Sequence, residues 1–241
     1  MTLTRAEARR IDAYARDVLG LPTLVLMENA ALNLAAVVDD LVRDDPARLP
    51  SRTRVDAVCG TGSNGGDGYA AARHLLGRGY EVRAWRAGPA DRARGDSAVN
   101  RNALRRMGLA ERTLTGADDL TDSDVVIDAV LGSGFDPAGG PLRPDAAAAV
   151  RAVNAAGDAG AVVVAADVPT GLDADRGATV ADLNDGRVVR ADVTVSFVAA
   201  KIGLTACPAA AGRVIVADIG LPDAAVIAAL THLRESDDAG A

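Results

Sequence analysis

Residues 60–68, Gly-Thr-Gly-Ser-Asn-Gly-Gly-Asp-Gly, form the segment whose composition most directly indicates chemistry. It follows an apolar run and opens a helical pattern, and Gly60, Gly62 and Gly65 have the Gly-x-Gly-x-x-Gly spacing of a dinucleotide-binding loop. Glycines let the backbone approach a ligand closely, and the amides at a helix N-terminus attract an anion. The segment therefore predicts a site for a dinucleotide-like ligand.

Two features of this region differ from an ordinary NAD-linked dehydrogenase. The next expected strand, residues 80–85, ends without the acidic residue that would bind a ribose hydroxyl. Glu81 is an acid at about the right distance along the chain, but it stands at the start of that strand. Asp67 lies where a phosphate should meet only amides, so it is either a functional carboxyl or the N-cap of the helix. A P-loop is disfavoured because the chain has no GxxxxGK[ST].

Further carboxylates follow two other apolar runs. Asp128 comes after residues 125–127, and Asp167 comes after residues 162–166, with Thr170 close behind. A charge at the end of a buried strand is costly unless it is paired or liganded, and open α/β sheets bind ligands beyond the carboxyl ends of their strands. Oxygen donors gathered there without His or Cys suit a hard cation, although each Asp could instead be a cap or turn residue.

One lysine and two histidines are also weighed as functional residues. Lys201 follows the run at 193–198 and is either a group that reaches the same crevice or an ordinary surface lysine. His74 lies well inside a helix and is expected to pack or hydrogen-bond, and His232 is a poor catalytic candidate. No Ser-His-Asp or Cys-His arrangement is legible, and Ser133 is not in a G-x-S-x-G motif.

Strand-like and helical patterns alternate along the chain. Strands are expected at 55–59, 80–85, 124–131, 161–166, 193–198 and 213–218, and helices at 4–19, 24–42, 68–78, 97–107 and 143–156. This alternation predicts a mainly parallel α/β sheet covered on both faces. The amphipathic N-terminal helices between Arg5 and Val42 are expected to pack on the sheet and to help form a homodimer. One domain over residues 1–241 is expected, with a surface excursion at 173–190 and a frayed tail from 233.

Composition narrows the partners and the compartment. Hydrophobic residues make up 49% of the chain, enough for a sizeable core. The net charge of −7 and the 2% aromatic content argue against a nucleic-acid partner. No membrane span or secretory signal is expected, and Cys59 and Cys207 are expected to be reduced, as in a cytoplasmic protein.

At several positions the chain resembles the NAD(P)H-hydrate epimerases, the YjeF N-terminal domain family. The resemblance runs from about residue 5 to about residue 220, and its motifs are Met27-Glu28-Asn29-Ala30, Ser63-Asn64-Gly65-Gly66-Asp67-Gly68, Ala72-Arg73-His74-Leu75, Asp128-Ala129-Val130-Leu131-Gly132, Asp167-Val168-Pro169-Thr170-Gly171-Leu172-Asp173, Val193-Thr194-Val195-Ser196-Phe197 and Lys201-Ile202-Gly203-Leu204. Ser63 stands where the family usually has Asn, Thr170 replaces a Ser and keeps the hydroxyl, and Ala31 stands where Gly is common. None of these departures removes a proposed function.

The resemblance implies a three-layer Rossmann-like fold, a homodimer and a bound potassium ion (K+). It implies an isomerase that interconverts the R and S forms of hydrated NADH and NADPH (NADHX and NADPHX), in functional pairing with a separate NAD(P)H-hydrate dehydratase because the chain is too short to include one. The implied metal ligands are Asn64, Asp128 and Thr170. The implied substrate contacts are Ser63, Asn64, Gly65, Gly66, Asp67, Gly132, Ser133, Gly134, Phe135, Asp136, Pro137, Ala138 and Asp167.

The catalytic residues expected for this chemistry are Asp167, Asp67 and Lys201. Asp167 is predicted to be the main acid–base residue, because burial at the end of an apolar strand should raise its pKa. Asp67 is the rival, and Lys201 would orient the leaving hydroxyl or its water. Two other functions stay open: a non-catalytic dimeric binding or scaffold module on the same fold, and an NAD-linked oxidoreductase.

Overall fold

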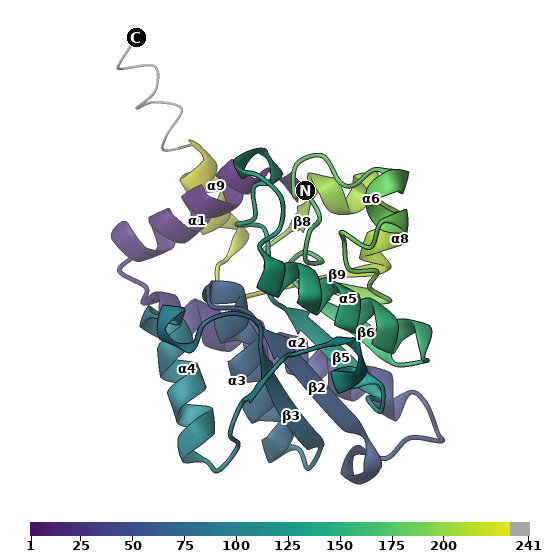
Figure 1. The fold of residues 1–241 in the computed structure, drawn as a ribbon. Helices are drawn as coiled ribbons and strands as arrows, with labels where there is room; N and C mark the ends of the chain where they lie inside the picture. Colours follow the sequence, from purple (N-terminus) through teal and green to yellow (C-terminus); the bar gives the residue numbers. More distant parts are fainter. Residues whose placement is uncertain (232–241) are drawn as a thin grey trace.

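The central feature of the computed structural model, which describes residues 1–231, is a seven-stranded parallel sheet (Figure 1). Its order is β4-β3-β2-β5-β6-β7-β9. The strands are β2 (Arg54–Cys59), β3 (Glu81–Arg86), β4 (Arg112–Thr113), β5 (Val125–Ala129), β6 (Val162–Ala166), β7 (Val193–Phe197) and β9 (Arg213–Ala217). The order reverses between β2 and β5, as in dinucleotide-binding folds, so the predicted Rossmann-like class is confirmed.

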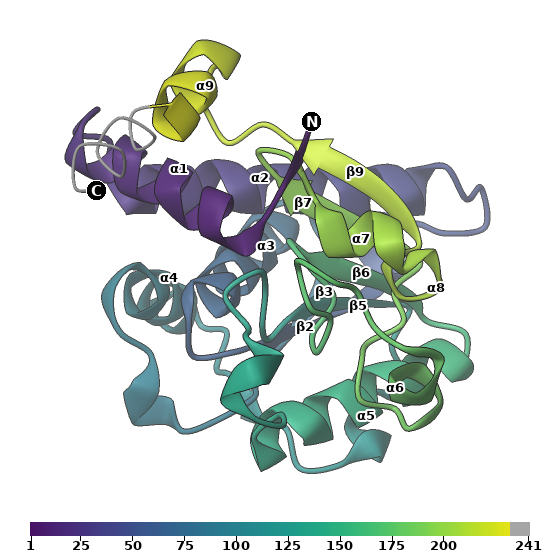
Figure 2. The same ribbon diagram turned by 90° about the horizontal axis from the view of Figure 1, so that it is seen from above.

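Helices cover both faces of the sheet, as Figure 2 shows. The α-helices of residues 1–231 are α1 (Arg5–Asp17), α2 (Thr23–Arg43), α3 (Ser63–Gly77), α4 (Gly95–Arg106), α5 (Pro144–Asp158), α6 (Val180–Asn184), α7 (Ile202–Ala206), α8 (Pro208–Ala211) and α9 (Asp223–Thr231), and not all of them lie on the sheet. On one face, Leu34 and Val38 of α2 and Leu75 of α3 share a core with alternate strand residues such as Ile127. On the other face α5 packs through Val150 and Val153 against Val126 and Val163. Strands that are apolar on both sides, as β5 and β6 are, suit this three-layer arrangement.

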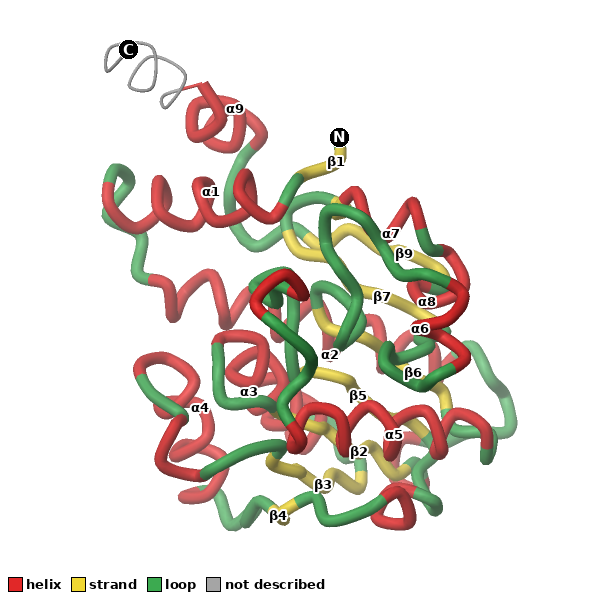
Figure 3. The backbone as a smooth tube through the Cα atoms, turned by 45° about the horizontal axis from the view of Figure 1, so that its top comes forward, coloured by secondary structure: helices red, strands yellow, loops and turns green. Residues whose placement is uncertain are grey.

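The first helix does not pack on the sheet, which corrects the expectation that both N-terminal helices would. Helix α2 lies on the sheet, whereas α1 packs against α9 and α2 through a separate cluster that includes Ile11, Ala15, Leu26 and Val226. Figure 3 shows α1 and α9 together at the edge of the molecule, beyond the end of the sheet. Helix α1 therefore lies over the carboxyl ends of the strands rather than on a face of the sheet.

A second, two-stranded sheet was not expected from sequence. Strand β1 (Thr2–Leu3) pairs in parallel with β8 (Ala200–Lys201), with Leu3 opposite Lys201. The excursion at 173–190 is also more ordered than predicted, because it includes α6 and buries Ala174, Val188 and Val189. The expected frayed tail from residue 233 lies outside the described residues.

The described residues also bear on two expectations about environment. None of the helices within residues 1–231 is long and apolar enough to cross a membrane. Cys59 and Cys207 are both buried and unpaired, as predicted for reduced thiols, and burial raises the pKa of the Cys59 thiol.

Candidate active site

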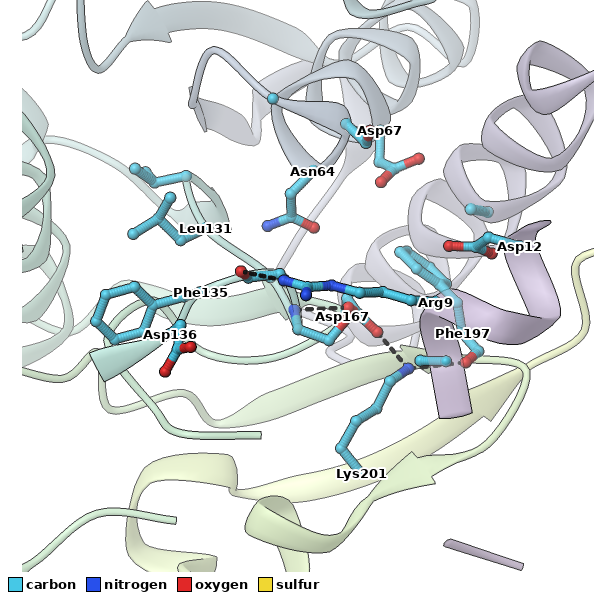
Figure 4. A pocket seen from close by; sticks show the side chains of 18 of the residues that line it. Arg9, Asp12, Asn64, Asp67, Leu131, Phe135, Asp136, Asp167, Phe197 and Lys201 are labelled. Atoms are coloured by element: carbon cyan, nitrogen blue, oxygen red, sulfur yellow. Dashed lines mark hydrogen bonds and ion pairs between the residues drawn. The ribbon is translucent and has the colours of Figure 1, made fainter. Parts of the chain in front are cut away.

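A cavity of about 820 Å³ lies beyond the carboxyl ends of the central strands, where the strand order reverses. Its walls come from α1, the start of α2, the start of α3, residues 130–143, and the ends of β6 and β7. Figure 4 shows Asn64 and Asp67 reaching in from one side and Lys201 from the other, with Asp167 between them. The structure thus brings the three predicted catalytic side chains to one pocket.

Asp67 is a buried carboxyl that faces this pocket. Helix α3 begins at Ser63 with Gly62 as its N-cap, so Asp67 lies in the second turn and is not the cap residue. Only 7% of Asp67 is exposed, and among residues 1–231 no group forms a hydrogen bond with its carboxyl. Burial, and then the charges of Asp167 and Asp12, raise the pKa of Asp67 well above its ordinary value. The surroundings of Asp67 therefore favour its protonated form.

Asp167 is in the opposite state. Lys201 Nζ forms an ion pair with Asp167 Oδ1, and the Ser133 N–H donates to Oδ2 at 2.9 Å. Burial raises the pKa of Asp167, but the Lys201 charge and these hydrogen bonds outweigh burial and lower the pKa below its ordinary value. The expectation of a raised pKa is wrong, because the Lys201 ion pair and the Ser133 hydrogen bond outweigh burial.

Lys201 is not a surface lysine. Only 2% of it is exposed, and besides Asp167 it donates to Phe197 O at 2.9 Å and Ser196 Oγ at 3.2 Å. The short β8 strand holds its backbone in place. Lys201 therefore keeps Asp167 ionised at the edge of the pocket.

Of the three implied metal ligands, Asn64 lines the cavity, whereas Asp128 and Thr170 contact each other outside its lining. Asp128 is fully buried in β5 and accepts hydrogen bonds from the Thr170 N–H at 2.7 Å and the Thr170 hydroxyl at 2.6 Å. Within residues 1–231 it has no cationic side chain as partner, and burial raises its pKa to about 6. The Asn64 amide nitrogen is buried without a hydrogen-bond partner. Asp128 and Thr170 supply a carboxylate and a hydroxyl, oxygen ligands of the kind that a hard cation prefers, and the Asn64 side chain would have to add its amide oxygen.

No other kind of metal site competes with it. Among residues 1–231, no three His, Cys, Asp or Glu side chains gather in a way that could hold a metal ion. A cation beside Asp128 would therefore depend on amide, hydroxyl and backbone oxygens as well as on one carboxylate.

The loop after β5 forms the wall next to Asp167. Gly132, Ser133, Gly134, Phe135 and Asp136 line the cavity. A Cβ built on Gly132 would lie 3.0 Å from both Asn64 Oδ1 and Asp167 Oδ2, so only glycine leaves these two groups undisturbed. The structure places Pro137 and Ala138 on the exposed outside of this loop, away from the cavity lining.

Four more of the predicted contacts divide in the same way. Ser63 and Asn64 line the cavity, whereas Gly65 and Gly66 are buried beneath it. A Cβ on Gly65 would lie 2.0 Å from Gly60 O, and one on Gly66 would lie 2.6 Å from Met27 Sδ. These two glycines therefore serve the close packing of α3 against its neighbours.

Helix α1 contributes a wall that the sequence reasoning missed. Arg9, Asp12 and Arg16 line the cavity from successive turns of this helix, and Arg9 donates to Gly134 O at 3.2 Å. Their spacing of three and four residues puts them on one helix face, which is the signal that could have found them. Burial among the walls and the Asp167 charge raise the pKa of Asp12 to about 6, although its surface is open to the cavity.

The histidines take no part in this site within the described structure. His74 Nε2 lies 2.8 Å from Glu28 Oε1 on the outer side of α3, which confirms the expected hydrogen-bonding role. His232 lies outside the described residues.

Comparison with known proteins shows which family the chain belongs to. The family model described as YjeF-related protein N-terminus matches residues 23–203, three quarters of the sequence. The chain belongs to this family. The crystal structure of the yeast protein ynu0 has a similar fold, with a TM-score of 0.69 and 23% identity over 85% of this chain and 83% of that one.

Curated relatives are of two lengths. The chain is 38% identical over 229 residues to the bifunctional NAD(P)H-hydrate repair enzyme Nnr of Moorella thermoacetica, covering 91% of this chain but 40% of that protein. It is 33% identical to the NAD(P)H-hydrate epimerase of Rhodopirellula baltica, covering 91% of this chain and 84% of the relative. It is 35% identical to the NAD(P)H-hydrate epimerase of Levilactobacillus brevis, covering 91% and 94%. The family member described here thus matches the stand-alone epimerases over most of their length and the bifunctional enzymes over two fifths of theirs.

Proposed function

We propose that this protein is an NAD(P)H-hydrate epimerase, an isomerase that interconverts the R and S forms of NADHX and NADPHX in the repair of damaged nicotinamide cofactors. The observation that carries the proposal is a pair of buried carboxyls in one pocket whose pKa values shift in opposite directions: burial raises the pKa of Asp67, and the Lys201 charge and hydrogen bonds lower that of Asp167. Two carboxyls whose environments separate their pKa values are suited to acid and base roles in one reaction. The names of the relatives of similar length support the same activity.

The pair accounts for each proton in the reaction. The substrate carries a hydroxyl on a ring carbon next to nitrogen. Asp67 gives its proton to this hydroxyl, the C–O bond breaks, water leaves, and the nitrogen lone pair forms an iminium. A second water then adds to the opposite face of that carbon as Asp167 takes its proton. No electrons leave the substrate, so the reaction needs no redox cofactor.

The remaining groups set up these transfers. Lys201 stabilises the ionised form of Asp167 before water is activated. The carboxylates also stabilise the positive iminium, because they lie at fixed positions in the pocket wall where that charge develops. General acid and general base catalysis each contribute roughly 10²–10⁴-fold in rate.

We also propose that potassium binds at Asn64, Asp128 and Thr170. The support is the buried Asp128 carboxylate, which has no cationic partner among residues 1–231, and the Thr170 hydroxyl bonded to it. When bound, the ion would supply a fixed positive charge that balances Asp128 and holds the loops after β2, β5 and β6 in place.

The proposal extends to partners and compartment. We infer a homodimer that uses the N-terminal helices, supported by the exposed Val25 and Leu32 on α2 beside Val99 and Met107 near α4. A monomeric mass by light scattering at micromolar concentration would contradict the proposed dimer without contradicting the proposed activity. We further propose a cytoplasmic location, which the two buried, unpaired cysteines support. We also propose functional pairing with an NAD(P)H-hydrate dehydratase, because longer relatives are named bifunctional NAD(P)H-hydrate repair enzymes.

One coupled assay tests the activity. A mixture of R and S hydrates is supplied with an S-specific dehydratase, with and without this protein. We expect the R form to persist without the protein and to drain completely when it is present. Persistence of the R form in both samples would leave the chain as a binding or scaffold module. Absorbance changes with NAD and a panel of alcohols would instead indicate a dehydrogenase.

A further inference from the structure

The proposed reaction leaves the enzyme in a different protonation state from the one in which it started. After one R-to-S conversion, Asp67 is a carboxylate and Asp167 is protonated. The next conversion in the same direction needs Asp67 protonated and Asp167 ionised again. When a dehydratase consumes only the S form, the flow is one-way, so one proton must return from Asp167 to Asp67 in every cycle.

Neither carboxyl is well placed to exchange this proton by itself. Asp67 is 7% exposed and Asp167 is 8% exposed. Asp167 is held by Lys201 and the Ser133 N–H, and within residues 1–231 no hydrogen bond joins either of these groups to Asp67. The return therefore needs a third group that is near both carboxyls and open to water.

Asp12 has this position. It stands on the α1 wall of the same cavity and is solvent-exposed there, and Figure 4 shows it entering the pocket beside Asp67 and above Phe197. It lies close enough to Asp167 and Lys201 for their charges to shift its pKa, and its own charge shifts the pKa of Asp67. Arg16, one turn along α1, is the other charged group that affects Asp12.

The other carboxyls of the cavity lining are already engaged. Asp96 accepts a hydrogen bond from the Thr23 hydroxyl, and Asp136 pairs with Arg5 at 2.9 Å. In the described part of the chain, no hydrogen bond or ion pair holds Asp12. Its pKa of about 6 lets Asp12 both accept and release a proton near neutrality.

We propose, on the basis of the function proposed above, that Asp12 carries the proton from Asp167 back to Asp67 between turnovers. The Asp12 carboxylate takes the proton from the Asp167 carboxyl through water in the pocket and becomes a carboxyl. It then gives this proton to the Asp67 carboxylate, which restores the starting state. One proton moves, and no bond to the substrate changes. Asp12 does not touch the reacting atoms; it acts on the reaction only by resetting the protonation of Asp167 and Asp67.

The decisive experiment compares a single turnover with repeated turnovers in Asp12→Asn. With enzyme in excess over the R form, the single conversion uses the resting protons, so we expect a rate within about threefold of wild type. With substrate in excess and an S-specific dehydratase present, each cycle waits for proton return, so we expect a loss of roughly 10²-fold. Added formate should restore the steady-state rate in proportion to its concentration, because a small acid can replace the missing carboxyl.

Three variants complete the test. Asp12→Glu keeps a carboxyl and should retain near-normal steady-state flow, and Asp12→Ala should repeat the loss and its rescue if Asp12→Asn does not fold. Asp17→Asn removes one negative charge from α1 at a residue that does not line the cavity, and it should behave as wild type. Equal losses in both regimes without response to formate, or no loss in either, would overturn the proton-return role while leaving the epimerase intact. Absence of any R-to-S conversion by wild-type protein would instead remove the proposed function itself.

Discussion

Asp167 and Val198 are the central residues of two left-handed γ-turns at the carboxyl ends of neighbouring strands. Asp167 has a φ of 66° and Val198 a φ of 68°. The Val168 N–H donates to Ala166 O at 2.8 Å, and the Ala199 N–H donates to Phe197 O at 2.8 Å. Both residues line the cavity, and the Phe197 carbonyl also accepts from Lys201. Strained backbone thus lies on both sides of the Asp167–Lys201 pair, where strain is most often functional.

The strain at Val198 predicts an inverted order of stability. Val198→Ala and Val198→Gly both lose the packing of the side chain, but only glycine adopts this φ at no steric cost. We expect Val198→Gly to have a free energy of unfolding about 1 kcal/mol higher than Val198→Ala in denaturant titrations. The matched control is Val195 in β7, where glycine should be the less stable of the two. An alanine variant at 198 that is the more stable would show that the turn carries no strain.

Asp167→Asn should abolish most turnover without preventing binding. Asn tolerates a left-handed backbone and keeps the shape of the side chain, but it removes the base and the partner of Lys201. We expect kcat to fall by about 10² or more while the substrate dissociation constant changes little. The buried Lys201 charge loses its counter-ion, so the free energy of unfolding should also fall, by about 3–5 kcal/mol.

The control for this variant is Asp158→Asn, which alters an exposed pair with Arg190 far from the cavity. Near-normal turnover in Asp167→Asn together with loss in Asp67→Asn would move the main acid–base role to Asp67.

Asp67→Asn should make the protein more stable as well as less active. The folded-state pKa of Asp67 is raised above its unfolded value, mainly by burial. Its contribution to stability is therefore complete below the unfolded pKa of about 4 and is lost as the pH rises through the folded pKa. The variant lacks this loss, so its advantage in free energy of unfolding should grow from pH 4 to pH 8. An advantage that does not change with pH would show that Asp67 titrates normally.

Potassium should stabilise the wild-type protein through Asp128. An ion that binds only the folded state raises the melting temperature as its concentration rises. We expect such an increase in KCl relative to choline chloride at equal ionic strength, and no such difference in Asp128→Ala. A wild-type melting temperature that is the same in both salts would argue against a cation at Asn64, Asp128 and Thr170.

Strands and glycine motifs were readable from sequence because they follow local rules. Apolar runs such as 162–166 can only be buried strands in a sheet covered on both sides, and polar residues after such runs must meet at one edge. The meeting of Asp67 and Asp167 in one pocket followed from this rule, whereas Lys201 remained either a crevice group or a surface lysine. The start of α3 at Ser63 was placed too late, at 68, because glycines are usually poor helix residues and here serve close packing.

What the sequence could not show depends on contacts between distant segments. The ionised state of Asp167 is set by Lys201, 34 residues away, and no local pattern predicts that pair. Asp12 was missed for the same reason, because the place of α1 over the cavity is decided by its packing on α9 rather than by the sheet.

Leu3 and Lys201 are opposite each other in the small β1–β8 sheet, so the first residues of the described chain brace the lysine that keeps Asp167 charged. A ribosome that adds about 5–20 residues per second would deliver these two strands roughly 10–40 s apart. Six of the seven strands of the large sheet, β2 to β7, are synthesised before β8. The pocket is completed only when β8 has been synthesised and pairs with β1. A nascent chain would therefore form its core before its pocket. A bulky group fused next to β1 would disturb the position of Lys201 more than it would disturb the large sheet.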